Sequence, residues 1–559
     1  MGSCLGCLLG PSKEVGALPI ETPFKMSSPM PSWPSGDGFA DGSIDLGGLE
    51  VRQISEFAKV WATGEGGEGD LGATFFAPSS VPDGFFALGS YAEPNNRPLF
   101  GWVLVAKDTS GGGGGGSLAR PVDYSLVWSS ESSNVKRDGN GYFWLPVAPE
   151  GYRAAGHIVT GTPEKPSLDA SRCVRSDFTE DCESDSQIWT SSGQDGVDVH
   201  GLRPSVRGTR ALGVWVGTFA ARPNSSSGGP PALACLKNKS SNLSSMPNRR
   251  QVQAIAQAYS PWVYFHPDEP YLPSSVSWFF DNGGLLYQKG NATATRVDST
   301  GSNLPQGGSN DGEYWLDLPS DRDGRDRVAK GDLAGAEANL HVKPMLGGTF
   351  TDVAVWMFYP FNGPARAKVG LINVKLGRIG EHVGDWEHVT LRVSNLTGEL
   401  WRVYFSEHSG GSWVDASLLE YRDGRPVAYA SLNGHAFYPK AGLVLQGDAR
   451  LGIGIRNDTA RGVEMDTGAR FGIVSAEYLG ASNDAVSEPP WLNYMREWGP
   501  KISYDVAEEL AKLGRFLPRK LRRALEDLVK GLPEEVLGEE GPTGPKVKAS
   551  WDMDETVKS

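Results

Sequence analysis

The residues best suited to chemistry gather in one short stretch, which begins at Glu381 and reads Glu-His-Val-Gly-Asp-Trp-Glu-His-Val-Thr-Leu-Arg-Val. Apolar and polar residues alternate in its second half, which is the period of a β-strand. By the same period Asp385 and Glu387 fall on the apolar side. Two carboxylates on a buried face must be protonated, paired with cations or bound to a metal, because an unpaired buried charge is very costly.

A divalent metal is one way to satisfy this carboxylate pair. Gly384 allows a bend that brings His382 to the same point as Asp385 and Glu387. One nitrogen and two carboxylates form a ligand set suited to Mg²⁺, Ca²⁺ or Mn²⁺. The stretch therefore predicts a metal site at His382, Asp385 and Glu387. A salt-bridged core, in which Arg392 or another arginine opposes the carboxylates, explains the same pattern, and a catalytic role is a third interpretation.

Other potential ligands lie elsewhere in the second half of the chain. The sequence His-Pro-Asp-Glu is a second acidic cluster, and two further histidines stand in Glu-His-Ser and Gly-His-Ala. They can join the metal site only where the fold brings them together. These additional candidates are His266, Asp268, Glu269, His408 and His435. The sequence contains no nucleophile elbow, phosphate-binding loop or zinc-protease motif, so we assign no catalytic residue.

The first residues, Met-Gly-Ser-Cys-Leu-Gly-Cys, match an acylation pattern. Gly2 presents the amine that N-myristoylation needs after Met removal, and Cys4 and Cys7 stand where palmitoylation usually follows. Two acyl chains hold a protein stably at a bilayer, whereas one holds it marginally. We therefore predict lipidation at Gly2, Cys4 and Cys7, although Gly6 stands where the pattern prefers Ser or Thr. An unmodified start without function, or thiol chemistry at the two cysteines, is the alternative.

Charge and composition exclude several classes of function. The 559 residues include 53 basic and 67 acidic side chains, a net charge of −14, which argues against a nucleic-acid partner. No apolar run approaches the length of a membrane span, and the start lacks the features of a secretory signal. We therefore expect a protein that is not secreted, attached through its acyl anchor to the cytoplasmic face of the plasma membrane or of an endosomal or vacuolar membrane.

The elements that must position these residues are mainly β-strands. Short apolar runs separated by Gly, Pro, Asn and Asp dominate from residue 38 onward. A pattern Pro-x-Gly-aromatic-x-Ala-x-Gly occurs in the segments 76–89 and 144–156, and the segment 210–219 keeps part of it. Three related β units favour a β-prism, with duplicated hairpins in an ordinary sandwich as the alternative.

The predicted organisation is mainly β, with an N-terminal β-prism-like domain, a C-terminal β-sandwich and a short helical tail. Apolar residues from Val506 to Leu528 recur every three or four positions and predict an amphipathic helix interrupted by Pro518, with a basic face between Arg515 and Arg523. We expect this helix to pack on its own domain, with an anionic membrane as the alternative. The predicted boundaries are a disordered, lipidated lead-in (1–36), a β-prism-like domain (37–221), a linker (222–248), a β-sandwich-like domain with the metal site (249–500), a helical segment (501–532) and a disordered tail (533–559).

Several motifs carry a family resemblance over residues 30–550. They include the segments 33–51, 91–105 and 168–182, Tyr-Phe-His-Pro-Asp-Glu-Pro-Tyr at 264–271, Glu-His-Val-Gly-Asp-Trp-Glu-His at 381–388, Ser-Leu-Asn-Gly-His-Ala at 431–436, and Pro-Pro-Trp-Leu-Asn-Tyr-Met-Arg-Glu-Trp-Gly at 489–499. In these residues the chain resembles the plant family of vacuolar protein sorting-associated protein 62. The resemblance implies a role in protein traffic to the vacuole and brings no established activity.

The stretch at 381–387 also resembles the Gly-His-Arg-His-Asp-Trp-Glu heptapeptide of the necrosis- and ethylene-inducing cytolysins. Asp385 and Glu387 match ligands of that family's divalent cation directly, and His382 corresponds to its first histidine. The second histidine has no counterpart, and Asn362 stands near the place of an upstream aspartate ligand. This resemblance implies a β-sandwich with a divalent cation.

Two functional hypotheses follow. The first is a non-enzymatic peripheral membrane protein in endosomal or vacuolar trafficking. The second is a divalent-metal-dependent lipid- or glycan-binding module, and a hydrolase that uses the same metal is a weaker variant of it.

Overall fold

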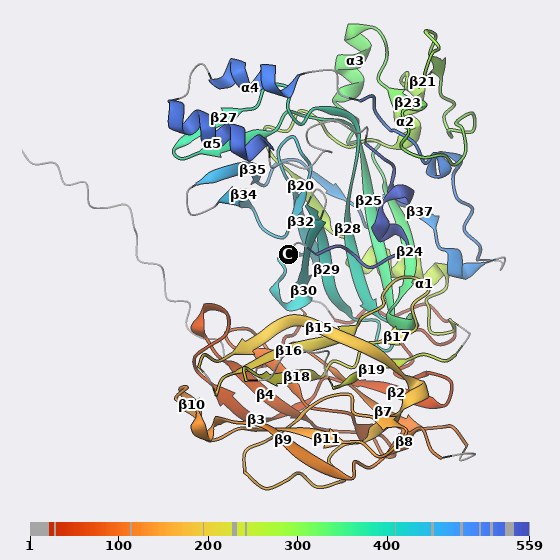
Figure 1. Cartoon of the computed structure of the whole chain (residues 1–559). Coiled ribbons are helices and arrows are strands. Elements are labelled where there is room, and N and C mark those ends of the chain that lie inside the picture. Colours follow the sequence, from red (N-terminus) through yellow and green to blue (C-terminus); the bar gives the residue numbers. More distant parts are fainter. Residues whose placement is uncertain are drawn as a thin grey trace, which may run out of the picture. The chain divides into compact units, whose positions relative to one another are not determined.

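A computed structural model describes residues 22–26, 29–111, 115–193, 195–225, 232–240, 243–407, 410–448, 452–480, 484–501, 505–514, 518–530 and 542–557. The chain divides into two compact units (Figure 1). Unit 1 holds Met1–Lys25, Asp45–Val206 and Gly213–Ser240, and unit 2 holds Met26–Ile44, Arg207–Leu212 and Ser241–Ser559. The prediction of a mainly β chain is confirmed.

The described residues of unit 1 form five small sheets. Their strand orders are β1 (Ile44–Asp45), β2 (Leu49–Ile54), β7 (Val103–Asp108), β5 (Phe86–Ala87); β10 (Arg137–Asp138), β3 (Phe57–Thr63), β4 (Ala73–Pro78), β6 (Tyr91–Pro94); β13 (Ile158–Thr160), β11 (Tyr142–Val147), β9 (Asp123–Ser129); β12 (Tyr152–Arg153), β14 (Cys173–Arg175), β8 (Leu118–Ala119); and β17 (Gly213–Val214), β19 (Ala234–Lys237), β15 (Thr179–Thr190), β16 (Val197–Pro204), β18 (Phe219–Pro223). In these sheets the neighbouring strands among β2 to β19 are antiparallel.

The internal repeat of the sequence marks a point where three segments of unit 1 meet. Gly89 and Gly156 end the two full repeats, and a Cβ on Gly89 would lie 2.8 Å from the Cα of Gly156 and 2.7 Å from Cγ2 of Thr218. Side chains larger than hydrogen are excluded there. The third unit therefore contributes Thr218 to this point, five residues beyond the Gly213 that the sequence pattern aligns with it. The arrangement of the sheets as a β-prism stays a prediction.

The core of unit 1 is aromatic. Trp61, Phe75, Trp128, Phe143 and Trp189 form one buried cluster. Their rings meet mostly edge-on or tilted, with centroids between 4.8 and 6.1 Å apart, which is a favourable geometry for aromatic pairs. The cysteines of this unit that the structure describes, Cys173, Cys182 and Cys235, are buried thiols without a disulfide bond.

Unit 2 contains the longest strands of the chain. Its sheets have the orders β30 (Gly410–Asp415), β29 (Leu400–Glu407), β28 (His382–Ser394), β25 (Phe350–Asn362), β24 (Ala338–Met345), β37 (Phe471–Ser475); β31 (Tyr421–Arg422), β32 (Arg425–Ala430), β20 (Trp262–Phe265), β36 (Glu464–Asp466), with β33 (Phe437–Tyr438) beside β32; β22 (Thr295–Arg296), β21 (Leu285–Gln288), β23 (Tyr314–Asp317); and β27 (Ile372–Lys375), β26 (Arg366–Val369), β35 (Ile453–Thr459), β34 (Gly442–Asp448). The predicted β-sandwich stays a prediction.

Helices of unit 2 flank these sheets. They are α1 (Arg249–Tyr259), α2 (Val276–Asp281), α3 (Arg322–Ala329), α4 (Val506–Gly514) and α5 (Arg519–Lys530). Asn248 caps α1 and forms a reciprocal capping box with Gln251, so the sequence itself fixes where α1 begins. No helix in the described parts of the chain is both long and apolar enough to cross a membrane.

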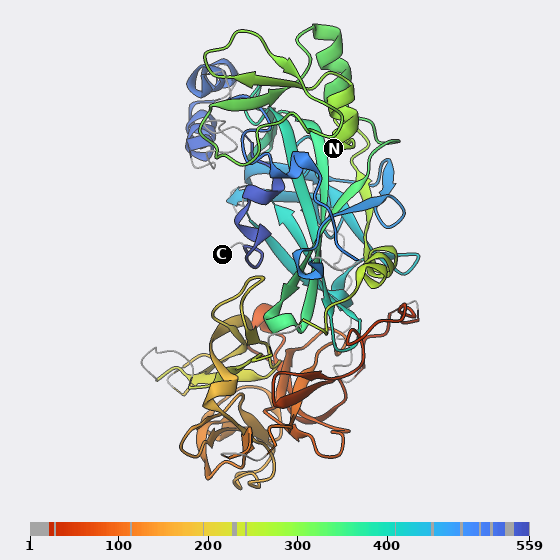
Figure 2. The same ribbon diagram turned by 90° about the vertical axis from the view of Figure 1, so that its right-hand side faces the viewer.

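Both faces of the six-stranded sheet are covered, because nearly every residue of β25 and β28 is buried. Phe358, Trp386, Trp491 and Trp498 form the centre of a large aromatic core on one face. The C-terminal segment, residues 542–557, lies along the long strands (Figure 2). Its two short 3-10 helices are Pro545–Val547 and Ala549–Trp551.

Three predicted boundaries need correction. The disordered tail is wrong for residues 542–557, where Trp551 is 3% and Glu555 7% exposed. The disordered lead-in is wrong near residue 34, because the Gln251 side chain donates a 3.0 Å hydrogen bond to the carbonyl of Pro34. Part of the predicted linker is the strand β19, which pairs with β15. Composition favoured disorder or a linker in these three places, because their tryptophans and short strands lie within polar, Pro-rich sequence.

The helical tail divides as its sequence predicts. Pro518 lies between α4 and α5, where it cannot donate a helical hydrogen bond. Leu525 and Val529 are each 1% exposed and pack against Ala367, Val369 and Ile455. The apolar face of α5 is therefore buried in its own unit.

Candidate polar cavity of unit 2

The candidate site lies in the six-stranded sheet where β28 pairs with β25 but not with β29. β28 pairs with β25 from His382 to Ser394, but its ladder with β29 begins only at Val389. The segment 382–388 therefore has an edge that β29 does not cover. A cavity of about 340 Å³ lies beside it, and its lining includes His382, Asp385, Glu387, His388, Tyr404 and Glu555.

Gly384 carries the bend that the sequence predicts. Its φ is 70°, a left-handed conformation that side chains rarely adopt. A Cβ there would lie 2.3 Å from the carbonyl oxygen of Trp498. Both the backbone conformation and the close approach of the chain thus require glycine.

Asp385 is bound by a histidine. His435 donates from Nδ1 to a carboxylate oxygen of Asp385 at 2.9 Å and from Nε2 to the carbonyl of Tyr271 at 3.0 Å. Glu269 lies 3.7 Å from Nε2, and the side chains of His435 and Glu269 are 0% and 1% exposed. The imidazole also stacks on the Tyr359 ring at 3.8 Å between centroids. The tight turn between β32 and β33 holds His435 in a left-handed conformation, φ 54°.

These contacts make His435 a buried cation. Burial alone lowers the pKa of His435, but the bond to Asp385 and the neighbouring Glu269 outweigh it and raise this pKa to about 10. Burial likewise opposes the charge on Asp385, yet the same bond holds the pKa of Asp385 below its ordinary value. Asp385 and His435 thus form a buried ion pair at neutral pH.

Glu387 behaves in the opposite way. Its burial and the charge of Asp385 raise the pKa of Glu387 well above its ordinary value. Ser406 forms a short hydrogen bond with the Glu387 carboxyl group. The two acids therefore differ, since the pKa of Asp385 is lowered and the pKa of Glu387 is raised.

The predicted metal ligands share the cavity but are already engaged. Nδ1 of His382 lies 3.1 Å from the carbonyl oxygen of Gly384, and burial lowers the pKa of His382. Within the described residues, no group of three or more His, Cys, Asp or Glu side chains is arranged to hold a metal ion. His382, Asp385 and Glu387 thus do not form a three-ligand centre in this structure. Metal binding itself stays a prediction.

The additional candidates separate into two groups. Glu269 and His435 join Asp385, as described above. His266 and Asp268 belong to a surface turn, where Nδ1 of His266 lies 3.9 Å from an Asp268 side chain that is 84% exposed. His408 lies outside the described residues, as do the predicted lipidation sites Gly2, Cys4 and Cys7.

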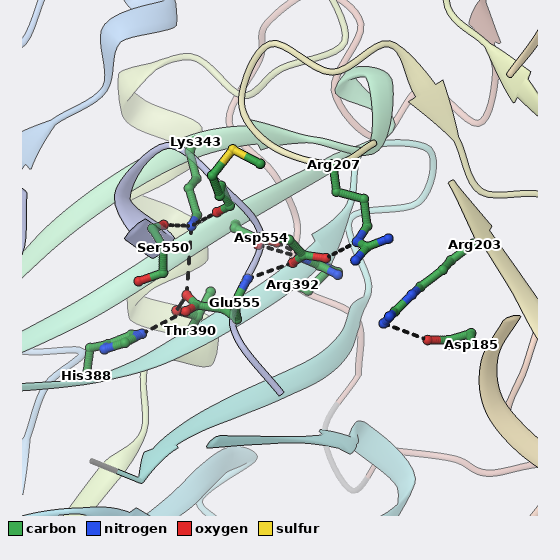
Figure 3. A network of polar contacts seen from close by, with 12 residues as sticks. Asp185, Arg203, Arg207, Lys343, His388, Thr390, Arg392, Ser550, Asp554 and Glu555 are labelled. Atoms are coloured by element: carbon green, nitrogen blue, oxygen red, sulfur yellow. Dashed lines mark hydrogen bonds and ion pairs between the residues drawn. The ribbon is translucent and has the colours of Figure 1, made fainter. Parts of the chain in front are cut away.

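Arg392 does not oppose Asp385 and Glu387, so that part of the salt-bridge interpretation is wrong. Its guanidinium instead donates to Asp352 at 2.8 and 2.7 Å and to Asp554 at 2.6 Å, and Arg207 adds a 3.0 Å contact to Asp554 (Figure 3). Asp352 and Asp554 raise the pKa of Arg392 against the opposing effect of burial. The alternation is nevertheless correct, since His388, Thr390 and Arg392 all face the C-terminal segment.

Glu555 completes this second cluster and was not found from the sequence. It accepts hydrogen bonds from Thr390 at 2.6 Å and from His388 at 3.1 Å, and the ammonium of Lys343 lies 3.8 Å away (Figure 3). Although burial opposes its charge, His388 and Lys343 lower the pKa of Glu555 to about 2. Lys343 also donates to the carbonyl of Met553 at 3.1 Å. The C-terminal segment is thus held on the sheet by buried charges.

Together, the fold and the cavity define a mainly β protein with a buried polar recess of ligand size. A family model described as Vacuolar protein sorting-associated protein 62 matches residues 20–555. The chain belongs to this family.

Two proteins of Saccharomyces cerevisiae (strain ATCC 204508 / S288c) are related to the chain. TDA6, a proposed vacuolar protein sorting-associated protein, is 25% identical over 291 residues, covering 43% of this chain and 59% of the relative. Vacuolar protein sorting-associated protein 62 is 24% identical over 300 residues, covering 46% and 61%. The match therefore spans about three fifths of each yeast relative.

Solved structures are similar only at low TM-scores. GNIP1Aa from Chromobacterium piscinae has a TM-score of 0.28 and 22% identity, covering 34% of this chain and 38% of that chain. Necrosis and Ethylene inducing Protein 2, from the causal agent of cocoa's Witches Broom disease, has a TM-score of 0.19 and 13% identity, covering 41% and 75%. Similarities at this level carry no argument about function.

Proposed function

We propose that the protein acts in vacuolar protein sorting as a non-enzymatic peripheral membrane protein, with the cavity beside β28 as its ligand-binding site. Family membership and the names of the two yeast relatives support the sorting role. One observation carries the binding role: the acids of the cavity already have protein partners. Asp385 is paired with His435 and Glu387 is bonded to Ser406, so these groups form a preorganised recess rather than an activated nucleophile and base.

A complementation experiment tests this function. Cells that lack the protein are given the wild-type chain or Asp385→Asn, and the fraction of a vacuolar cargo that is secreted is measured. Asp415→Asn is the matched control, because Asp415 pairs with Arg402 on the same sheet away from His435. We expect wild type and the control to restore sorting and Asp385→Asn to fail at equal protein level. Full rescue by Asp385→Asn would remove the cavity from the function.

The membrane anchor is the second part of this function. Acylation at Gly2 and at Cys4 or Cys7 would hold the protein on the cytoplasmic face of the plasma membrane or of an endosomal or vacuolar membrane. Fluorescent fusions of wild type and of Gly2→Ala, Cys4→Ser, Cys7→Ser test it, with Ser3→Ala as the matched control. We expect only the triple variant to leave the membrane. An equal distribution of all three proteins would contradict the anchor.

Divalent-metal-dependent binding of a lipid or glycan is the second candidate function. The observation that favours it is the surplus of acid, since Asp385 raises the pKa of Glu387 in the same cavity. A cation such as Mg²⁺, Ca²⁺ or Mn²⁺ would replace the proton on Glu387. Calorimetric titration of each metal into wild type and Asp385→Asn tests this candidate. Binding to wild type alone supports it, and equal heats in both proteins contradict it.

A further inference from the structure

The sheet β27-β26-β35-β34 of unit 2 exposes apolar side chains at one of its turns. Leu371 stands in the turn between β26 and β27 and is 99% exposed, and the next residue, Ile372, is 40% exposed. The turn is firmly placed, because the strands pair up to Val369 and Ile372 and the backbone of Gly370 bonds to Gly452 at 3.1 Å. The turn therefore presents two neighbouring apolar side chains to solvent at a fixed position.

A helix with a basic exposed face packs on the same sheet as this turn. α5 packs on β26 and β35 through Leu525 and Val529, and Figure 1 shows it lying over the β26–β27 hairpin. Four of the first five residues of α5 are basic, and its two acids, Glu526 and Asp527, come later. The exposed basic residues of α5 are Arg519, Lys520, Arg522 and Arg523, and the hairpin adds Lys375, which is exposed, and Lys368, which is half-buried.

This concentration of positive charge runs against the rest of the chain. The whole sequence has a net charge of −14, yet the exposed side chains in the first turns of α5 are basic, as are Lys368 and Lys375 of the hairpin. Within the described residues, no carboxylate forms an ion pair with the four exposed basic side chains of α5. The first turn of a helix also carries partial positive charge, so these residues are not placed to stabilise α5 itself. Their charge therefore favours an anionic partner.

We propose that Leu371 and the basic face of α5 form a membrane-contact surface for an anionic lipid leaflet. Basic side chains bind anionic lipid headgroups at a distance set by the Debye length, without a shaped partner. A protruding leucine can enter the acyl region of a bilayer, which has no need of a complementary pocket. A protein partner would instead need a larger apolar centre than one leucine and its neighbour.

The inference rests on the proposed function for the presence of a membrane, but it does not require the acyl anchor. The surface would set how unit 2 contacts a leaflet on which the N-terminus is already held. Two weak attachments to the same membrane reinforce each other through effective concentration.

Vesicle sedimentation of the full chain made in bacteria tests the proposal, because that protein carries no acyl chain. Vesicles of phosphatidylcholine with and without phosphatidylserine are compared. We expect binding only with phosphatidylserine, and a loss of binding at high salt. Arg522→Gln, Arg523→Gln should bind about 30-fold more weakly, equivalent to about 1 kcal/mol for each lost charge. The matched control is Arg322→Gln, Lys330→Gln on and beside α3, where both residues are exposed.

A second variant tests the apolar turn. We expect Leu371→Ser to weaken binding about tenfold, since part of a leucine side chain leaves the bilayer. Val463→Ser, at a residue that is 52% exposed, is the matched control and should bind like wild type. Equal binding to both vesicles, or equal binding by the α5 variant and its α3 control, overturns the proposal. An unchanged Leu371→Ser overturns the insertion of the hairpin turn.

The two membrane hypotheses can fail separately. If the acyl-site fusion stays on the membrane in cells while vesicle binding requires Arg522 and Arg523, the contact surface stands and the anchor fails. If the fusion leaves the membrane and unacylated protein binds no vesicle, the anchor stands and the contact surface fails.

Discussion

Two buried ionic clusters in unit 2 use their charges differently. The cavity cluster places three acids, Glu269, Asp385 and Glu387, around the cation His435. Lys548 also lines the cavity and lowers the pKa of Asp385 and of Glu387. The strap cluster, between β24, β25, β28 and the C-terminal segment, matches three acids with three cations. Its acids are Asp352, Asp554 and Glu555, and its cations are Lys343, Arg392 and Arg207.

The difference separates a cluster that stabilises the fold from a cluster that can bind a ligand. A matched cluster satisfies itself and holds the chain together, whereas a surplus of acid must be neutralised by a proton or by something that enters the cavity. The strap cluster also follows the strand register, since Lys343, Asp352 and Arg392 are direct neighbours across β24, β25 and β28. The cavity cluster instead joins three loops or strand ends at a sheet edge.

The largest expected effect is the loss of the central cation of the strap cluster. We expect Arg392→Met to lower the free energy of unfolding by about 3–5 kcal/mol, because Asp352 and Asp554 remain buried without their partner. Urea denaturation at neutral pH measures the loss. Arg322→Met, at a side chain that is 91% exposed, is the matched control and should change the stability by less than about 0.5 kcal/mol. Equal effects in the two variants would contradict the structural role of the strap cluster.

The cavity cluster should reveal its cation in alkaline solution. The folded pKa of His435 is about 10 and its ordinary value is 6.5, so the stabilisation is complete below pH 6.5 and disappears as the pH rises toward 10. Between these values the free energy of unfolding should fall by about 3 kcal/mol or more. Urea denaturation from pH 6 to 9 measures this slope. His435→Gln should flatten it, and a steep slope that survives in His435→Gln would contradict the ion pair.

Glu555 tests the other cluster in acid. Its folded pKa is about 2 against an ordinary 4.5, so its stabilisation is present above pH 4.5 and is lost as the pH falls toward 2. We expect Glu555→Gln to lose about 2 kcal/mol at pH 7, with a difference from wild type that shrinks below pH 4.5. Denaturation at pH 7 and pH 3 measures both values. The exposed Glu337→Gln is the control, and a loss that is independent of pH would contradict the ionised carboxylate.

Local sequence predicted one cluster better than the other. Alternation along β28 placed Asp385 and Glu387 in a buried environment, and they are 9% and 6% exposed. It also predicted that His388, Thr390 and Arg392 share the opposite face. Periodicity could not identify their partners, because Glu555 lies 167 residues from His388 in the chain. Only a tertiary contact joins them, and the Gly- and Pro-rich sequence before residue 545 concealed it.

The fold shows the same division between local and long-range information. Strand composition predicted a mainly β chain, and helical spacing predicted α4 and α5 with their break at Pro518. The sequence did not predict the strand β19, because only four residues form it within a polar segment. His435 was a candidate ligand, but its role as the cation of Asp385 depends on a turn that brings it to β28 from another sheet.

The smallest expected effect distinguishes a protonated from an ionised Glu387 in the cavity. Folding favours the protonated form of Glu387, because burial and Asp385 raise its pKa well above the ordinary 4.5, and at pH 7 this shift costs free energy that an amide does not. Glu387→Gln should therefore be more stable than wild type by about 1 kcal/mol at pH 7, and equal to it near pH 4. Urea denaturation at the two pH values, in the presence of a metal chelator, measures this difference. A destabilised Glu387→Gln would mean that the carboxylate is ionised in the folded protein. If that loss appeared only when Mg²⁺, Ca²⁺ or Mn²⁺ replaced the chelator, it would favour the metal-binding function over the proton-neutralised recess.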